Sequence, residues 1–168
     1  RDAQESRGLG DVYKRQKSLY QILDSVFKRQ KKTACLGINW LIFGSSNLVE
    51  DPEDGVINAF THCARDEFEW NQLVKSCVIP SKIVGWVNPH LPLQTFGYKK
   101  INLDGKKIVQ PRNELPKKKK IRLYHYFVKN KKHFEEKVNK GMADRNAKRS
   151  MDEFYYCLLY TSPSPRDS

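Results

Sequence analysis

The spacing of apolar residues predicts a helix near the start of the chain. Between residues 17 and 32, leucine, isoleucine, valine and phenylalanine recur every three or four positions, which is the repeat of one buried helical stripe. Ser18 precedes the stripe and is a candidate N-cap, because its hydroxyl can accept a hydrogen bond from a free backbone N–H. We therefore expect an amphipathic helix over residues 17–32.

A nearly continuous apolar run follows this helix. Residues 33–43 read TACLGINWLIF, which is too short for a long helix and apolar at both sets of alternating positions. Such a run is typical of a strand that is buried on both faces in a parallel or mixed sheet. Residues 44–54 then collect Gly, Ser, Asn, Asp and Pro, which indicate a loop.

The middle of the chain alternates short strand-like segments with turns. Residues 73–80 and 83–87 are rich in β-formers, and residues 55–65 favour a strand over a short helix. Prolines in residues 88–92 predict an extended loop. Asp104-Gly105 lies between two short apolar segments and predicts a hairpin turn.

A strand and a helix complete the pattern. Residues 121–128 alternate and contain many β-formers, whereas residues 131–140 are predicted to be a helix with Asn130 as its N-cap. Gly141 follows where a left-handed residue commonly ends a helix, and Phe134 would face the sheet. The alternation of both element types predicts an α/β or mixed α+β fold, with a mixed sheet flanked by helices.

The two ends of the chain lack this patterning. Residues 1–16 have no hydrophobic period, and residues 157–168 are a short apolar stub followed by a Ser/Pro/Arg tail. Both strings resemble adapter sequence translated at the ends of metagenomic assemblies, and disordered natural tails are the alternative. We therefore expect one domain over residues 17–156, forming part of a longer protein and incomplete at its N-terminus.

Charge adds the expectation of a polyanionic partner. The 168 residues include 31 Lys+Arg against 19 Asp+Glu, which gives a formal net charge of +12 at pH 7. Aromatic residues make up 11% of the chain, which argues against disorder. No apolar run approaches the roughly 20 residues that span a bilayer. The charge alone does not distinguish nucleic acid, anionic lipid and nucleotide phosphate.

A lysine-rich stretch raises the hypothesis of a nucleic-acid-binding module. Residues 117–120 are four consecutive lysines, and further lysines occur nearby in the sequence. A solvated loop is the alternative interpretation, and no zinc-finger or RNP-type motif accompanies the lysines. We keep the module as an alternative but do not expect nucleic acid to be the partner.

Polar residues in and after the buried run are candidates for a site. Asn39 and Trp40 interrupt the run, and a Gly-Ser loop opens at its carboxyl end, where ligand crevices in α/β sheets lie. An acidic loop follows, in which Asp51 and Glu53 are candidate general bases toward an alcohol. Plain solvation of the loop is the alternative.

The later strand carries a second set of candidates. Alternation places Arg122, Tyr124 and Tyr126 on one face of the strand and Leu123 and His125 on the other. His125 is either a core histidine or a metal ligand, because neutral imidazole is the commonest metal-binding side chain.

The order of these motifs resembles glycosyltransferase family 92 and the related family 2-like group, which have the GT-A fold. The motifs are N-W-x-x-F-G-S-S, P-x-x-G-V-I, V-K-S-x-V-I-P, P-H and I-R-x-x-H-Y-F-x-K. The matching residues are Asn39, Trp40, Phe43, Gly44, Ser45, Ser46, Pro52, Gly55 to Ile57, Val74, Lys75, Ser76, Val78 to Pro80, Pro89, His90, Arg122, His125, Tyr126 and Lys129. The resemblance covers essentially all of residues 17–156.

The resemblance implies a partial GT-A (Rossmann-like) fold and a hexosyltransferase-like, metal-dependent enzyme. The enzyme would move a sugar from a nucleotide-sugar donor to a glycan or lipid-linked acceptor, with Mn²⁺ or Mg²⁺ on the leaving pyrophosphate. His125 would complete the metal shell. The family's D-x-D-E-F motif would lie before residue 17 but is missing here, so we expect this chain alone to be inactive. Asn47 also replaces the family's glycine.

The resemblance also assigns binding roles. Arg122 would touch phosphate, with a surface salt bridge as the alternative, and Trp40 would stack on a sugar, with plain core packing as the alternative. The implied donor- and acceptor-binding residues are Asn39, Trp40, Phe43, Gly44, Ser45, Ser46, Lys75, His90, Arg122 and Tyr126. A non-catalytic glycan-binding domain is another alternative function.

A cellular location follows from the same expectations. Peripheral contact with an anionic membrane is expected in addition to the sugar partners. The enzyme would lie in the cytoplasm or on the cytoplasmic face of the membrane in a bacterium, or in the Golgi in a eukaryote.

Overall fold

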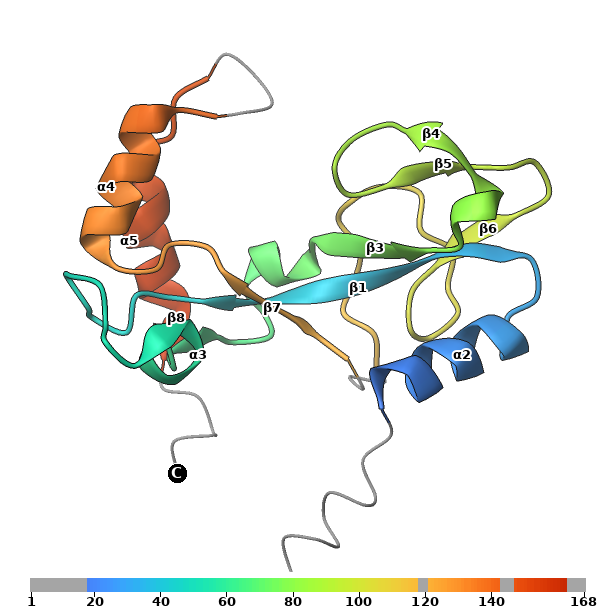
Figure 1. The fold of residues 1–168 in the computed structure, drawn as a ribbon, viewed down its shortest axis with the longest axis horizontal. Coiled ribbons are helices and arrows are strands. Elements are labelled where there is room, and N and C mark those ends of the chain that lie inside the picture. The colour runs from blue at the N-terminus through green and yellow to red at the C-terminus, as the bar shows by residue number, and fades with distance from the viewer. Residues whose placement is uncertain (1–17, 118–120, 143–146, 163–168) are drawn as a thin grey trace, which may run out of the picture.

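The long strand β1 (Thr33–Phe43) organises the fold. A computed structural model describes residues 18–117, 121–142 and 147–162, so the expectations for residues 1–16 lie outside the described residues. β1 is buried along almost its whole length, as its apolar composition predicts. It crosses the molecule between two groups of strands (Figure 1).

β1 is shared by two half-sheets. Residues 33–39 pair antiparallel with β3 (Val74–Val78) and parallel with β6 (Lys99–Ile101). Residues 40–43 pair parallel with β7 (Leu123–Tyr126), and Phe43 also pairs with β2 (Cys63–Ala64). The resulting mixed sheet, flanked by helices, confirms the predicted α/β class.

Helix α2 (Leu19–Arg29) covers the first half-sheet. Ser18 accepts a hydrogen bond from the Gln21 N–H, and the Gln21 side chain accepts one from the Ser18 N–H, so the predicted N-cap is confirmed as a capping box. Val26 of the helix packs against Leu36 and Ile101. The apolar stripe read from the sequence is therefore the face that seals this half of the core.

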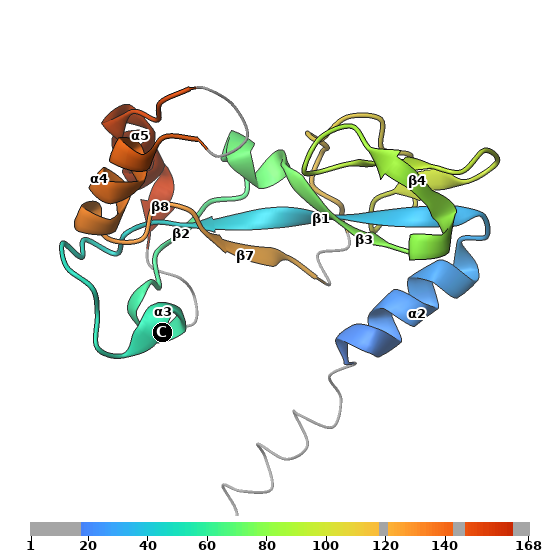
Figure 2. The same ribbon diagram turned by 45° about the horizontal axis from the view of Figure 1, so that its top comes forward.

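Helices α4 (Lys131–Lys140) and α5 (Met151–Tyr160) cover the second half-sheet. They lie side by side near the end of β1 that is remote from α2 (Figures 1 and 2). The predicted cap is confirmed, because Asn130 accepts from the His133 N–H, and Gly141 has φ 74°. Phe134 is fully buried against Trp40 and Ile42, as predicted.

The boundary expected after residue 156 falls inside α5. Cys157 is fully buried in the same core as Phe134, and β8 (Thr161–Ser162) pairs with β2. A methyl group on Gly44 would lie 2.9 Å from Thr161 Cβ, so the loop after β1 leaves room for β8 only because it carries glycine there. Residues 157–162 are thus packed on the sheet.

The strand favoured over residues 55–65 is wrong for its first part. Residues Gly55–Ala59 form the short helix α3, and only β2 is extended. The reason lies at the edge of β1. β1 ends at Phe43, which pairs antiparallel with Cys63, so continuing that register would place residues 55–59 beyond the end of β1, where the described part of the chain has no strand to pair with them. The 3₁₀ helix η1 (Glu69–Gln72) lies along the preceding part of this edge, where the Ile42 N–H bonds to the Asn71 side chain.

The remaining elements lie near the first half-sheet. The predicted strand over 83–87 is confirmed as β4 (Ile83–Trp86), which follows the 3₁₀ helix η2 (Pro80–Lys82). It pairs with β5 (Pro92–Gln94) in a separate two-stranded sheet. The Asp104-Gly105 turn also forms, with Gly105 at φ 83° and its N–H bonded to the Asn102 carbonyl.

None of the helices within the described residues has the length and apolarity that crossing a membrane requires.

Candidate functional site

A pocket of about 330 Å³ opens beside the second half-sheet. Its walls come from β1, η1, the β4–β5 connection, the segment after β7 and the facing ends of α4 and α5. The lining residues are Trp40, Trp70, Leu73, His90, Arg112, Phe127, Met142, Arg149 and Glu153. A volume in this range, with apolar walls and a few polar groups, is typical of small-molecule sites.

Aromatic rings form the apolar part of the pocket. Trp40 is 8% exposed, and its ring lies 5.3 Å from that of His90 and 4.1 Å from that of His125. Trp70 meets Phe127 edge to face at 5.1 Å. The Trp40 indole Nε1 is buried and has no hydrogen-bond partner among the described residues. The pocket therefore combines flat apolar faces with an unsatisfied donor on one of its lining rings.

Charged side chains form the polar part. The Arg149 guanidinium is 2.9 Å from Glu153 and lies 5.2 Å from the centre of the Phe127 ring. Arg112 pairs with Glu69 at 2.7 Å, and this hydrogen bond lowers the pKa of the Glu69 carboxyl. The rim thus presents fixed guanidinium and carboxylate groups, which can hydrogen-bond hydroxyl or anionic groups of a ligand.

His125 stays neutral behind Trp40. Burial lowers the pKa of His125 from 6.5 to about 4, and the positive charges of Lys137, Lys75, His90 and Arg149 act in the same direction. A neutral imidazole can accept a hydrogen bond or bind a metal ion, so the ring is chemically competent for the predicted ligand role.

This pKa predicts acid lability. The unfolded chain binds a proton at His125 near pH 6.5, whereas the folded protein resists it down to about pH 4, so stability falls as the pH is lowered through this window. The lost stability is about 2 to 3 kcal/mol. Urea unfolding of His125→Gln should show a correspondingly flatter fall between pH 6.5 and 4. His62→Gln, in the connection before β2, is the control; an equal flattening there would contradict the prediction.

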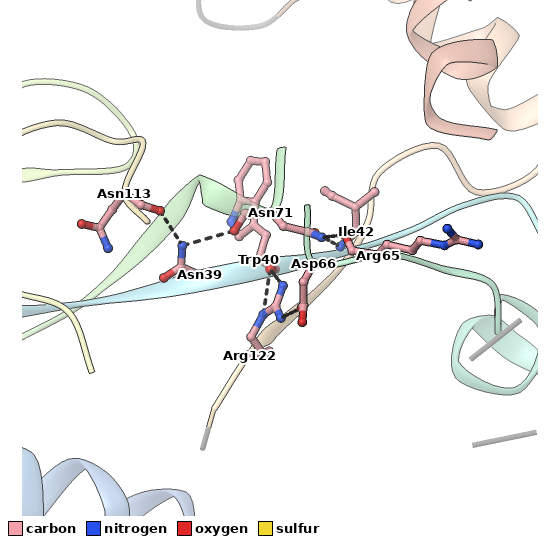
Figure 3. Close-up of polar contacts among 8 residues, drawn as sticks. All are labelled: Asn39, Trp40, Ile42, Arg65, Asp66, Asn71, Asn113 and Arg122. Carbon is pink, nitrogen blue, oxygen red and sulfur yellow. Dashed lines mark hydrogen bonds and ion pairs between the residues drawn. The ribbon is translucent and has the colours of Figure 1, made fainter. Parts of the chain in front are cut away.

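Asn39 holds the backbone together next to the pocket. Its side chain is 1% exposed, and its Nδ2 donates to the carbonyl oxygens of Asn71, Gln72 and Asn113 at 3.1 to 3.2 Å. Figure 3 shows the side chain lying between η1 and the segment that carries Asn113. Asn39, predicted to bind donor or acceptor, therefore uses its Nδ2 to link three segments, while its buried Oδ1 has no hydrogen-bond partner among the described residues.

Arg122 is also occupied within the fold. Its Nε donates to the Trp40 carbonyl oxygen at 3.0 Å, and its Nη1 lies 3.0 Å from the Asp66 carboxylate (Figure 3). The Arg122 side chain is 10% exposed. The structure thus places the guanidinium in an internal ion pair, in line with the salt-bridge alternative, rather than at the pocket rim.

The side chains of the predicted F-G-S-S loop, residues 43–46, make their contacts within the fold. Phe43 is fully buried and lies 4.8 Å from the ring of Tyr126. Ser45 is buried, and the Ser46 hydroxyl accepts hydrogen bonds from the N–H groups of residues 61 and 62. Neither this loop nor Tyr126 lines the pocket described above.

The acidic loop lies at the N-terminal end of α4, whereas the pocket lies at the C-terminal end of that helix. The Asp51 carboxylate accepts a 2.7 Å hydrogen bond from Asn130, the N-cap of the helix, and Glu53 is exposed in the same loop. The pocket includes Met142, just beyond the other end of α4. Ten residues of helix span about 15 Å. The predicted general bases are therefore not brought to this pocket.

Three of the predicted residues do meet at the pocket. Trp40 and His90 line it, and the Lys75 ammonium lies 6.0 Å from the centre of the Trp40 ring while donating to the Pro89 carbonyl. The His90 ring bonds through Nδ1 to the Val74 carbonyl at 2.9 Å. β1, β3 and the β4–β5 connection therefore converge at this point.

Sequence reasoning missed most of the lining. The residues it missed are Trp70, Leu73, Arg112, Phe127, Met142, Arg149 and Glu153. Arg149 and Glu153 are four positions apart at the start of a helix, and this spacing was the one local signal available.

A divalent-metal site does not assemble from the residues that the structure describes. Among residues 18–117, 121–142 and 147–162, no three His, Cys, Asp or Glu side chains group so that they could hold an ion. His125 is surrounded by cationic groups and aromatic rings. The described residues alone therefore do not form the predicted Mn²⁺ or Mg²⁺ site.

Comparison with known proteins gives no relative. No family model, curated protein or solved structure matches this chain.

Proposed function

We propose that this chain is the saccharide-binding part of a GT-A-type glycosyltransferase. The enzyme would transfer a sugar from a nucleotide-sugar donor to a glycan or lipid-linked acceptor. The observation that carries the proposal is the pocket that Trp40, Trp70 and Phe127 line together with Arg149, Glu153 and His90. The motif order in the sequence supports the same assignment.

The chemistry of the pocket suits a sugar ring. A pyranose has apolar C–H faces that pack on aromatic rings, and equatorial hydroxyls that need charged or polar partners around the edge. Trp70 and Phe127 supply the aromatic rings, and the Arg149–Glu153 pair supplies charged partners for the hydroxyls. Arg149 would donate to hydroxyl oxygens, while Glu153 would accept from hydroxyl protons.

A nucleic-acid site is supported less well. Binding through lysines is driven by counterion release and needs an open, charged surface. The aromatic rings here are instead recessed, and Trp40 is almost entirely buried. The acidic Glu153 on the rim would also repel a phosphate backbone.

Saccharide binding tests the proposal directly. Titration calorimetry of the full chain against neutral and acidic mono- and disaccharides should give binding that Glu153→Gln weakens about fivefold. Trp70→Ala should weaken it by about tenfold or more, because an aromatic stacking partner is lost. Trp86→Ala, which changes an exposed tryptophan outside the pocket, is the matched control and should bind as the unchanged chain does.

Two outcomes would overturn the proposal. One is the absence of any saccharide binding together with salt-sensitive binding of single-stranded nucleic acid. The other is saccharide binding that neither pocket substitution changes. If the chain is joined to an upstream D-x-D-containing segment and binds sugar without any transfer, the non-catalytic glycan-binding alternative replaces the transferase.

A further inference from the structure

The β4–β5 hairpin exposes a group of large apolar side chains. They are Val84, Trp86, Val87, Leu93 and Phe96. Phe96 is fully exposed, and Val84 is 70% exposed. Single exposed apolar residues are ordinary, but five of them within residues 84–96 indicate a region that makes contacts. The hairpin stands off the main sheet at the end remote from α4 and α5 (Figures 1 and 2).

The inner part of the hairpin is firmly attached. Leu91 and Pro92 are buried, and Leu91 packs with Val74 and Ile108. The Lys100 ammonium donates to the Pro92 carbonyl at 3.1 Å, and the Thr95 N–H bonds to the Lys82 carbonyl. The exposed apolar side chains are thus held outward by an ordered element.

The stretch of sequence that contains the hairpin carries charge of one sign. The chain has no Asp or Glu from residue 70 to residue 103, a stretch that includes Lys75, Lys82, Lys99 and Lys100. The Lys82 ammonium lies 4.9 Å from the centre of the Tyr98 ring, and Lys75 donates to a neutral carbonyl. Apolar side chains flanked by cations are complementary to an anionic bilayer, which offers hydrocarbon beneath negatively charged headgroups.

We propose that residues 83–98 are a peripheral docking element for anionic membranes. Trp86 and Phe96 enter the interfacial region of the bilayer, and Lys82 at the base of the hairpin contacts lipid phosphates and carboxylates. Three of the five exposed apolar residues are aliphatic. Aliphatic side chains have no ring face on which a nucleic-acid base can stack, so the composition favours lipid over single-stranded nucleic acid.

The hairpin is also connected to the pocket. His90 lies between β4 and β5 and lines the pocket, while its main-chain oxygen accepts a hydrogen bond from Ser76 of β3. Docking through the hairpin would hold the pocket near the lipid surface. A lipid-linked acceptor would suit this placement, but the docking proposal itself does not depend on sugar transfer.

Vesicle binding of the full chain tests the proposal. The chain should co-sediment with phosphatidylcholine vesicles containing phosphatidylserine and only weakly with phosphatidylcholine alone. The double variant Trp86→Ser/Phe96→Ser should bind about tenfold or more weakly, and Lys82→Gln about fivefold more weakly. Ile57→Ser, which removes an exposed apolar side chain from α3 at the far end of the molecule, should bind unchanged.

A second readout locates the contact. The fluorescence of Trp86 should shift to the blue on vesicle binding and be quenched by brominated lipid, and Trp86→Phe should remove most of both signals. Binding that the double variant leaves intact would overturn the proposal, as would equal affinity for neutral vesicles. The proposal would also be overturned if the chain formed a dimer in solution that the double variant dissociates. Nucleic acid binding that requires Trp86 and Phe96 would overturn it as well. None of these measurements involves a saccharide, so they stand apart from the test of the pocket.

Discussion

Replacing Arg122 with methionine is expected to lower the free energy of unfolding by about 3 kcal/mol. The side chain is 10% exposed and donates to the Trp40 carbonyl in the middle of β1. Methionine fills similar space but donates nothing, so this bond to a charged group is lost at a buried position. The ion pair to Asp66 adds less, because the Asp66 side chain is 40% exposed.

Urea unfolding monitored by circular dichroism measures this effect. The free energy of unfolding of Arg122→Lys should lie between the values of Arg122→Met and of the unchanged chain, since an ammonium can replace part but not all of the guanidinium's hydrogen bonding. Asp66→Asn should cost less than about 1 kcal/mol. If Asp66→Asn costs as much as Arg122→Met, the ion pair rather than the bond to β1 is the stabilising contact, and our account of Arg122 is wrong.

Replacing Asn71 with leucine should cost a similar amount, about 3 kcal/mol. Asn71 is fully buried in η1, where its Oδ1 accepts from the Ile42 N–H at 2.9 Å and its Nδ2 donates to the Arg65 carbonyl at 2.7 Å (Figure 3). Leucine has the same number of side-chain heavy atoms and the same branching, but it leaves both main-chain groups without this partner. Unsatisfied buried groups each cost about 1 to 3 kcal/mol.

The neighbouring residue gives a matched control for Asn71. Gln72 bonds to Asn39 through its main-chain oxygen, so Gln72→Leu should change the free energy of unfolding by less than about 1 kcal/mol. Thermal unfolding of both variants, followed at the same pH and ionic strength, compares them directly. Equal midpoints for Asn71→Leu and the unchanged chain would show that the edge of β1 does not rely on this side chain.

Elements with a strong local pattern could be predicted from the sequence. The apolar stripe and Ser18 predicted α2, the eleven-residue apolar run predicted β1, and Asn130 with Gly141 bounded α4. In each case the signal and the structure it specifies lie within a few neighbouring residues. Periodicity and capping are local effects, so one sequence is enough to read them.

The helix α3 and the roles of single polar residues could not be predicted in this way. The extended conformation favoured for residues 55–65 does not form over residues 55–59, because β1 ends at Phe43 and leaves those residues no strand to pair with in the described part of the chain. Arg122 was identified as a polar residue of interest, but its partner is a main-chain oxygen 82 positions away. Nothing in a local pattern specifies such a partner.

The pocket was predictable only in part, for the same reason. Trp40, His90 and the nearby Lys75 were identified from motif order, whereas Trp70, Arg112 and Arg149 enter the lining from other segments. Residues 157–162 illustrate a different difficulty. Their resemblance to adapter sequence predicted a tail outside the domain, whereas α5 extends to Tyr160 and packs Cys157 in the core.

The division of β1 into two halves has a consequence for the order of assembly. Its first half meets β3 across a chain separation of 41 residues, as between Cys35 and Ser76, whereas its second half meets the β7 region across 82, as between Trp40 and Arg122. Doubling a loop adds only about 0.6 kcal/mol of closure entropy. The greater chain separation therefore adds little to the cost of pairing β7 with β1, and the bond from Arg122 to β1 is large enough to offset that added closure entropy.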